Sequence, residues 1–381
     1  MGVDVNPGIR SYMLAIQKTV SVSTRTPPPP NTYNYEPRLT NSRKKYTFPP
    51  ITPLPNFNHE TTDPIQLRPF KPKYHLTMGL TNIPLSDFLP IDNTYKSRLA
   101  LRSSLISNHR DTVIGVSDDD GRDTRVRQAV EELYAFVIGW YLPSRYPSMF
   151  RVIPAPSSRK GGEVLENKVT GDTWPTTLAN TQNAEIALEI LGKTIDEDFL
   201  ILLPNPSTEK YHLSAYITCY PSGFNPARKL GLQLSTIHAP VPGYAEKLEK
   251  SMDRFFARIE VGKVGKRVNW SVTTGAGLFA AFGGTHARVG EEFESLGAGE
   301  LDVESTFLRC ERQTLHRLPT SKALIFAFHT YTYPIQQIKD EGLGEELASA
   351  IDGLKEGNVP EMHFYKRGSV WGEAVKAFLR S

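Results

Sequence analysis

The sequence predicts an α+β fold built on an antiparallel sheet with flanking helices. Apolar and more polar residues alternate from Tyr211 to Cys219, a period of two that is typical of a strand. Further strands are expected at residues 199–203, 268–272, 305–316 and 323–331. Because helices do not alternate regularly with these segments, they favour an antiparallel sheet over a doubly wound parallel one.

Proline marks the expected start of the folded part. Residues 26–55 contain 9 of the 29 prolines of the chain, including the run from Pro27 to Pro30. Such a segment favours extended, solvated conformations and cannot build a hydrogen-bonded ladder. We therefore expect residues 1–60 to form a disordered, proline-rich arm and residues 61–381 to form the folded domain.

Helical periodicity indicates several helices around this sheet. After Gly121, apolar residues recur every three or four positions and so share one face: Val126, Ala129, Val130, Leu133, Phe136, Val137 and Trp140. Other helices are expected at residues 92–108, 184–191, 244–259 and in the tail, 341–379. The folded domain should therefore have helical N- and C-terminal flanks.

Charge and cysteine content exclude several classes of function. The 44 basic and 41 acidic residues give a net charge of +3, so nucleic-acid binding is not expected. Cys219 and Cys310 cannot form a disulfide framework or a four-thiolate metal site, and this usage suits a reducing compartment. No stretch reaches the roughly 18 apolar residues of a membrane span. We expect a cytoplasmic protein, and a mitochondrial presequence stays open because basic residues outnumber acidic ones in the first 25 positions.

A glycine-rich stretch carries a weak nucleotide-binding motif. Gly275 to Ala280 matches G-x-G-x-x-A after a predicted strand. A dinucleotide fold also needs a following helix, a second strand and an acidic residue about 20 positions further on. The chain continues instead with Gly283-Gly284-Thr285-His286 and a region rich in glycine and glutamate, so we expect a flexible loop.

The octapeptide from Ile237 to Tyr244 is the most informative segment. The run from Leu234 to Ile237 predicts a strand that leads to His238, followed by a bend with Pro240 and Pro242. Each proline fixes φ at about −65° and removes a hydrogen-bond donor, so the imidazole leaves the strand in a set direction. Rigid placement suits a metal ligand, and the alternative is a histidine that is satisfied within the core.

A predicted strand from Arg309 to Arg317 carries unusually many charges. In a strand, alternate residues share a face, which groups Arg309 with Glu311 and Gln313, and Arg312 with Thr314 and His316. Burying such charges is costly unless they pair or bind an ionic ligand. The segment is therefore either an edge strand with a solvated face or a strand that lines a polar pocket, with arginines for carboxylates.

At these residues the chain resembles a known family, the haem-dependent oxidative N-demethylase α-subunit family, which includes many fungal members. Five stretches carry the resemblance: residues 73–80, 219–224, the octapeptide, 268–272 and 311–319. Their order and spacing also fit, so the resemblance covers about residues 65–335.

The resemblance implies a PAS-like core, a small antiparallel sheet with flanking helices around b-type haem (haem b). In the characterised bacterial system, this haem activates O₂ and oxidises a small methylated amine to the demethylated amine and formaldehyde. Electrons come from NADPH through separate flavin and iron–sulfur components. A separate reductase is therefore the expected partner of this chain.

The resemblance also assigns roles to residues. His238 is the expected proximal ligand of the haem iron, held by the proline bend. Tyr244 and Glu311 are expected catalytic residues of the distal pocket, where a buried carboxylate suits a cationic amine. The expected contacts of the haem propionates are Arg312, Arg317 and Arg267.

Two features depart from the bacterial pattern and leave the substrate and the redox partner open. His329-Thr330-Tyr331 stands where the family often has an arginine before Thr-Tyr, and the proline-rich arm is additional. The alternative function is a haem-based sensor or ligand-binding PAS protein without turnover, and a third is a relative that has lost haem. A distal acid favours catalysis, and the output domain that a sensor usually carries is not visible in the 381 residues. A haem-dependent monooxygenase acting on an N-methyl or related C–H bond is therefore the leading hypothesis.

Overall fold

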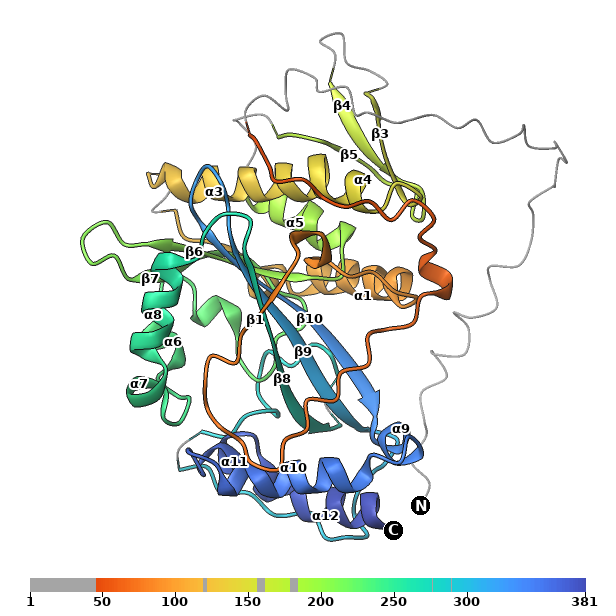
Figure 1. The fold of residues 1–381 in the computed structure, drawn as a ribbon, viewed down its shortest axis with the longest axis vertical. Coiled ribbons are helices and arrows are strands. Elements are labelled where there is room, and N and C mark those ends of the chain that lie inside the picture. Colours follow the sequence, from red (N-terminus) through yellow and green to blue (C-terminus); the bar gives the residue numbers. More distant parts are fainter. Residues whose placement is uncertain (1–45, 119–121, 156–161, 179–183, 276, 289) are drawn as a thin grey trace, which may run out of the picture. The chain divides into compact units, whose positions relative to one another are not determined.

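The computed structural model describes residues 46–381, apart from 119–121, 156–161, 179–183, 276 and 289 (Figure 1). Most of the predicted arm, residues 1–45, lies outside the described residues. Residues 46–60 were expected to belong to the arm, but they pack against the helices: Ile51 is buried, and the Phe48 ring lies 5.2 Å from that of Phe136. Ordered packing therefore begins before residue 61, because apolar side chains between the prolines cover the core.

Seven strands form the central sheet, in the order β1-β8-β9-β10-β6-β7-β2. The strands are β1 (Thr81–Ile83), β2 (Ile114–Val116), β6 (Asp198–Pro204), β7 (Tyr211–Ile217), β8 (Val264–Thr274), β9 (Thr306–Arg317) and β10 (Leu324–Pro334). Every pairing in this sheet is antiparallel. The predicted α+β class is confirmed, and each of the five longer strands covers a segment that was expected to be a strand.

The charged strand β9 lies in the middle of the sheet, between β8 and β10. Its backbone is paired along both edges over nearly its whole length. Arg309, Glu311 and Arg312 are all buried in it. The edge-strand alternative is therefore wrong, and each of these charges needs a partner inside the protein.

One layer of helices packs over part of the sheet and is shown above it in Figure 1. It contains α1 (Tyr95–Asn108), α2 (Arg110–Val113), α3 (Thr124–Tyr134), a π-helical stretch (Ala135–Tyr141), α4 (Leu142–Arg145) and α5 (Ala184–Thr194). The apolar face predicted after Gly121 is buried from Val126 to Val137, and Trp140 is partly buried. A small second sheet of β3 (Phe150–Pro154), β4 (Glu163–Asn167) and β5 (Thr173–Pro175) packs beside this layer.

The predicted helical tail is confirmed and packs against the other end of the sheet (Figure 1). It consists of α9 (Ile335–Asp340), α10 (Gly344–Glu356), α11 (Met362–Tyr365) and α12 (Gly368–Arg380). Leu347, Ile351 and Trp371 form a core there with Trp270 and Cys310. The remaining short helical turns are His59–Thr61, Leu85–Asp87 and Pro226–Arg228.

The segment before His238 is a short helix, α6 (Leu234–His238), and the predicted strand is wrong. The amide of Ile237 donates to the carbonyl of Gln233 (2.9 Å), which closes a helical turn. Gln233, just before the turn, forms a single β-bridge to His212, and Leu234 is the one buried residue of the turn. Tertiary packing thus overrides a weak local preference for strand. The helix expected at 244–259 is confirmed as α7 (Tyr244–Lys247) and α8 (Glu249–Arg258).

The glycine-rich stretch after β8 lies in a loop, and Ala276 is outside the described residues. Among the described residues between Thr274 and Thr306, no helix or strand occurs.

Both cysteines are buried and free. None of the described helices has the length and apolar character needed to cross a membrane.

Candidate functional site

A cavity of about 1070 Å³ lies against one face of the sheet. Side chains from the long strands form its floor, among them Leu200, Leu213, Leu315 and Phe328. The other walls come from α6, α7, α8, the loops at 222–229 and 281–291, and residues 362–367. Cofactor and ligand sites usually span about 300–1,000 Å³, so a cofactor of substantial size fits.

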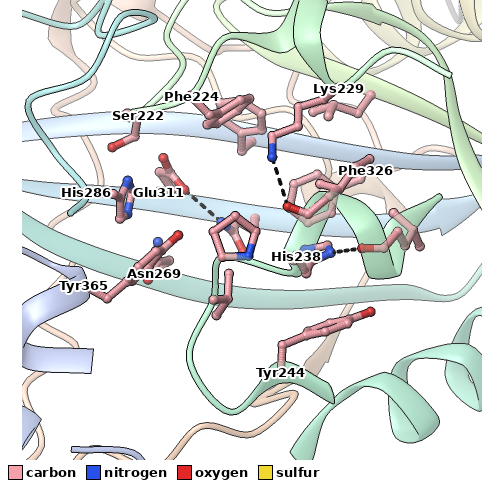
Figure 2. Close-up of a pocket in the computed structure, with 18 of the residues that line it drawn as sticks. Ser222, Phe224, Lys229, His238, Tyr244, Asn269, His286, Glu311, Phe326 and Tyr365 are labelled. Carbon is pink, nitrogen blue, oxygen red and sulfur yellow. Dashed lines mark hydrogen bonds between the residues drawn. The ribbon is translucent and has the colours of Figure 1, made fainter. Parts of the chain in front are cut away.

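Four of the six predicted site residues line this cavity: His238, Tyr244, Arg267 and Glu311. Figure 2 shows His238 and Tyr244 toward one end, and Glu311 toward the other with Asn269, His286 and Tyr365. Arg312 and Arg317 are absent from the described lining. The structure therefore brings together segments that are far apart in the sequence.

His238 ends α6 at the cavity wall, and its ring orientation is fixed. Its Nδ1 lies 2.8 Å from the carbonyl of Leu234, so Nδ1 carries the proton and donates. Burial lowers the pKa of His238, as do Arg267 and Lys229, although the Leu234 hydrogen bond opposes the shift. The neutral ring therefore keeps a lone pair on Nε2. This is the arrangement typical of metal-ligating histidines, whose other ring nitrogen donates to a carbonyl or carboxylate.

The donor set of the cavity fits haem better than a metal held by side chains alone. Within the part of the chain that the structure describes, no group of three or more His, Cys, Asp or Glu residues can hold a metal ion. A haem iron needs only one axial side chain, because the porphyrin supplies the other ligands. The neutral imidazole of His238 in a large, mostly apolar cavity meets that requirement.

Tyr244 lies beside His238, and its expected distal position needs correction. The two rings stack with centroids 4.8 Å apart and an interplanar angle of 13°. The Tyr244 hydroxyl points to Sδ of Met252 (3.7 Å), and burial raises the pKa of Tyr244 to about 12. Its place follows from Gly243, which has φ +71° and turns the chain tightly into α7. Tyr244 thus packs against the imidazole of His238, and its hydroxyl does not face the Glu311 end of the cavity (Figure 2).

Glu311 lies on β9 and faces the cavity, as its alternation with Gln313 predicts. Its Oε2 accepts a hydrogen bond from Nε2 of Gln313 (2.8 Å). Arg267, Arg309 and Lys366 are close enough for the Glu311 charge to act on them. Glu311 is therefore a buried carboxylate surrounded by cations, which gives the cavity a polar end.

Arg312 and Arg317 are held away from the cavity, and their expected roles at the propionates need correction. Arg312 faces the other side of β9 and donates to the carbonyls of Phe88 (3.0 Å) and Asp87. Arg317 lies at the strand end and donates to the carbonyl of Ile259 (2.8 Å), among others. Backbone carbonyls satisfy both guanidinium groups, so neither is available to a ligand here.

Arg267 on β8 is the one predicted propionate contact that reaches the cavity. It makes no hydrogen bond or ion pair with any described residue, and its side chain is partly buried at the cavity wall. Burial lowers the pKa of Arg267, and nearby Tyr74 and Glu311 oppose this shift only in part. A partly buried cation that faces a cavity without a partner suits an anionic group, and a carboxylate matches the guanidinium geometry.

Several residues of the polar end were missed by sequence reasoning. Nζ of Lys366 donates to Oδ1 of Asn269 (3.1 Å) and to the carbonyl of Trp270. Burial, and then the charge of Arg267, lower the pKa of Lys366 to about 7. Lys366 follows α11 in the C-terminal tail, for which the sequence predicts helices and nothing more. No local sequence pattern therefore indicates that Lys366 lines the cavity. The tertiary packing of the tail brings it here.

His329, the residue that departs from the family pattern, sits in a buried acidic cluster. Its Nδ1 lies 3.2 Å from Oε2 of Glu197, and its Nε2 lies 3.4 Å from Oδ2 of Asp196. Burial alone lowers its pKa, but the two carboxylates outweigh that effect and raise the pKa of His329 above its usual value. A protonated imidazole therefore supplies the positive charge that an arginine would carry.

Comparison with known proteins agrees with this geometry. A family model described as haem-dependent oxidative N-demethylase, alpha subunit-like, matches residues 79–376, which include His238, Arg267 and Glu311. No curated protein matches the chain. Because the model covers well over half of the sequence, the chain belongs to the haem-dependent oxidative N-demethylase α-subunit-like family.

Proposed function

We propose that this chain is a haem-dependent monooxygenase subunit that removes a methyl group from a small amine, using O₂ and externally supplied electrons. The observation that carries the proposal is the His238 imidazole, which is held at Nδ1 by a backbone carbonyl and lines a cofactor-sized cavity. The family match supports the reaction class.

The chain's own residues would hold a haem b as follows. Nε2 of His238 would bind the iron, and Tyr244 would keep the ring in place by stacking. Arg267 would bind a propionate, because its guanidinium faces the cavity and makes no hydrogen bond or ion pair with a described residue. When bound, haem supplies the site of O₂ activation.

Glu311 is proposed to attract the amine to the polar end of the cavity. The cations around Glu311 oppose the approach of an ammonium ion. Lys366 relieves part of this repulsion, since its pKa of about 7 lets Nζ release its proton near neutral pH. Glu311 and Lys366 together therefore set the charge that a substrate meets.

The sheet topology supports the PAS-like core that the resemblance implies. Counted in chain order, the five longer strands lie in the order 2-1-5-4-3, with α6, α7 and α8 between the second and third. The family description as an α subunit supports a separate partner, which we propose to be an NADPH-dependent reductase with flavin and iron–sulfur centres.

The absorption spectrum tests the proposal. The chain titrated with hemin should develop a Soret band, and His238→Ala should abolish it. His212→Ala is the matched control, because His212 lies on β7 outside the described cavity lining. A Soret band that is unchanged in His238→Ala would eliminate His238 as the ligand. Formaldehyde release from dimethylamine with reductant and O₂ then separates the demethylase from a sensor, which binds haem without turnover.

A further inference from the structure

A second histidine, His286, lines the same cavity and has no role in the proposed function. It belongs to the glycine-rich loop after β8 and follows Gly283-Gly284-Thr285. Figure 2 shows it at the end of the cavity that holds Glu311 and Tyr365, away from His238. The two imidazoles thus face the cavity from separate positions.

The loop that carries His286 is fastened to neighbouring segments on both sides. The amide of Gly223 donates to the carbonyl of Ala280 (2.9 Å), and the amide of Ala287 donates to the carbonyl of Tyr365 (2.8 Å). The His286 ring packs against that of Tyr365, with centroids 4.7 Å apart. The sequence predicts a flexible loop here, but these contacts fix the position of His286.

A chain of polar groups fixes the orientation of the ring. Oγ of Ser222 donates to Oγ1 of Thr285 (3.3 Å), which in turn lies 3.3 Å from Nδ1 of His286. The backbone of Ser222 also hydrogen-bonds the ring. The hydrogen bond to the Ser222 backbone favours the charged ring, so the ring is the donor in it. Nδ1 is the ring nitrogen that lies beside Gly223, the residue after Ser222, and we therefore assign the proton to Nδ1. The lone pair of the neutral ring is then on Nε2. No described residue hydrogen-bonds Nε2 of His286.

Gly223 makes this arrangement sterically possible. Its φ of +73° suits glycine, and a Cβ atom there would lie 2.3 Å from Oγ1 of Thr285 and 2.6 Å from Nδ1 of His286. Any side chain at this position would therefore displace the imidazole.

The charge state of His286 is settled by its surroundings. Burial lowers its pKa to about 4, and the nearby cations Lys366 and Arg309 act in the same direction. At neutral pH the ring therefore carries no charge, and its free Nε2 is a hydrogen-bond acceptor inside the cavity.

We propose that Nε2 of His286 accepts a hydrogen bond from the N–H group of the amine that binds in this cavity, and so selects amines that carry at least one N–H. This inference rests on the proposed function for the class of substrate. It adds a second acceptor to the Glu311 carboxylate, which supplies negative charge and can itself accept a hydrogen bond from an N–H group.

The test compares two cations of equal charge, dimethylammonium and tetramethylammonium, of which only the first has N–H groups. Hydrogen bonds to charged groups stabilise by about 1.5–3 kcal/mol, so His286→Leu should weaken dimethylammonium binding about tenfold or more. Tetramethylammonium binding, measured by calorimetry on the same protein, should change less than about twofold on this reasoning. His286→Gln, which retains an acceptor, should restore part of the difference.

Gly223→Ala should reproduce the effect of His286→Leu. Gly171→Ala is the matched control, because Gly171 has φ +81° and nothing lies within 4 Å of its added Cβ. Equal affinity of wild-type and His286→Leu chains for dimethylammonium overturns the inference, as does a wild type that does not discriminate between the two cations. Loss of the Soret band in His286→Leu also overturns it, because His286 would then be an iron ligand. If the wild type shows no Soret band, the proposed function fails. The comparison of the two cations still tests whether His286 accepts a hydrogen bond from the amine.

Discussion

Substitution of Tyr244 distinguishes a residue that holds His238 from one that acts on substrate. The rings of Tyr244 and His238 stack at 4.8 Å, whereas the hydroxyl reaches only Sδ of Met252. Stacked aromatic pairs contribute about 0.5–1.5 kcal/mol beyond their buried area. Tyr244→Leu should therefore weaken haem binding about two- to tenfold by this measure. Tyr244→Phe keeps the ring and should bind haem like the wild type.

The assay is a hemin titration followed at the Soret band, with formaldehyde release measured on the same samples. We expect Tyr244→Phe to retain both haem affinity and turnover, because a thioether is a weak acceptor and the lost hydroxyl contact is a minor one. A Tyr244→Phe protein that keeps its haem but loses turnover would refute the reasoning. The hydroxyl would then act on substrate, as a distal catalytic residue does.

The remaining predictions concern the polar groups on both faces of the sheet. Glu311→Gln should keep the Soret band and lose most formaldehyde release, so full activity would remove Glu311 from the site. Arg267→Gln should weaken haem binding with little change in melting temperature. Arg312→Gln should leave haem affinity unchanged but lower the stability of the fold by about 1–3 kcal/mol, because buried carbonyls lose their donor. Because the pKa of His329 is raised, its stabilisation is complete below its unfolded pKa and is lost as pH rises through the folded pKa. His329→Arg should therefore flatten the fall in stability that urea unfolding shows as the pH rises above the unfolded histidine pKa of about 6.5, and an unchanged pH profile would contradict this.

The proposed site depends on which side of the strand each charge faces. Glu311 and Arg312 are neighbours in the sequence, yet Glu311 lines the cavity and Arg312 bonds carbonyls at Asp87 and Phe88 beneath the helical layer. Because alternate residues of a strand face opposite sides, the charged residues of β9 lie partly in the cavity and partly under the helices. The assignment of Arg312 to the haem propionates overlooked this alternation.

Periodicity in the sequence was sufficient to predict the fold class and most elements. Strands β6 to β10 and helices α1, α3, α5, α8, α10 and α12 all occupy expected segments, since repeats of two or of three to four residues reflect burial on one face. The segment from Leu234 to Ile237 was predicted wrongly. It is too short for periodicity to decide, and its packing against the cavity favours a helical turn.

By itself the sequence determined the antiparallel α+β class and the membership of a haem-dependent family, and it singled out His238 as a candidate ligand. Only the tertiary structure decided which other residues share the cavity with that histidine. Lys366, Tyr365 and His286 come from a helical tail and a glycine-rich loop, whose local patterns carry no sign of a common site. The physical reason is that a cavity is lined by segments distant in the chain, and their meeting depends on long-range packing that no local repeat encodes.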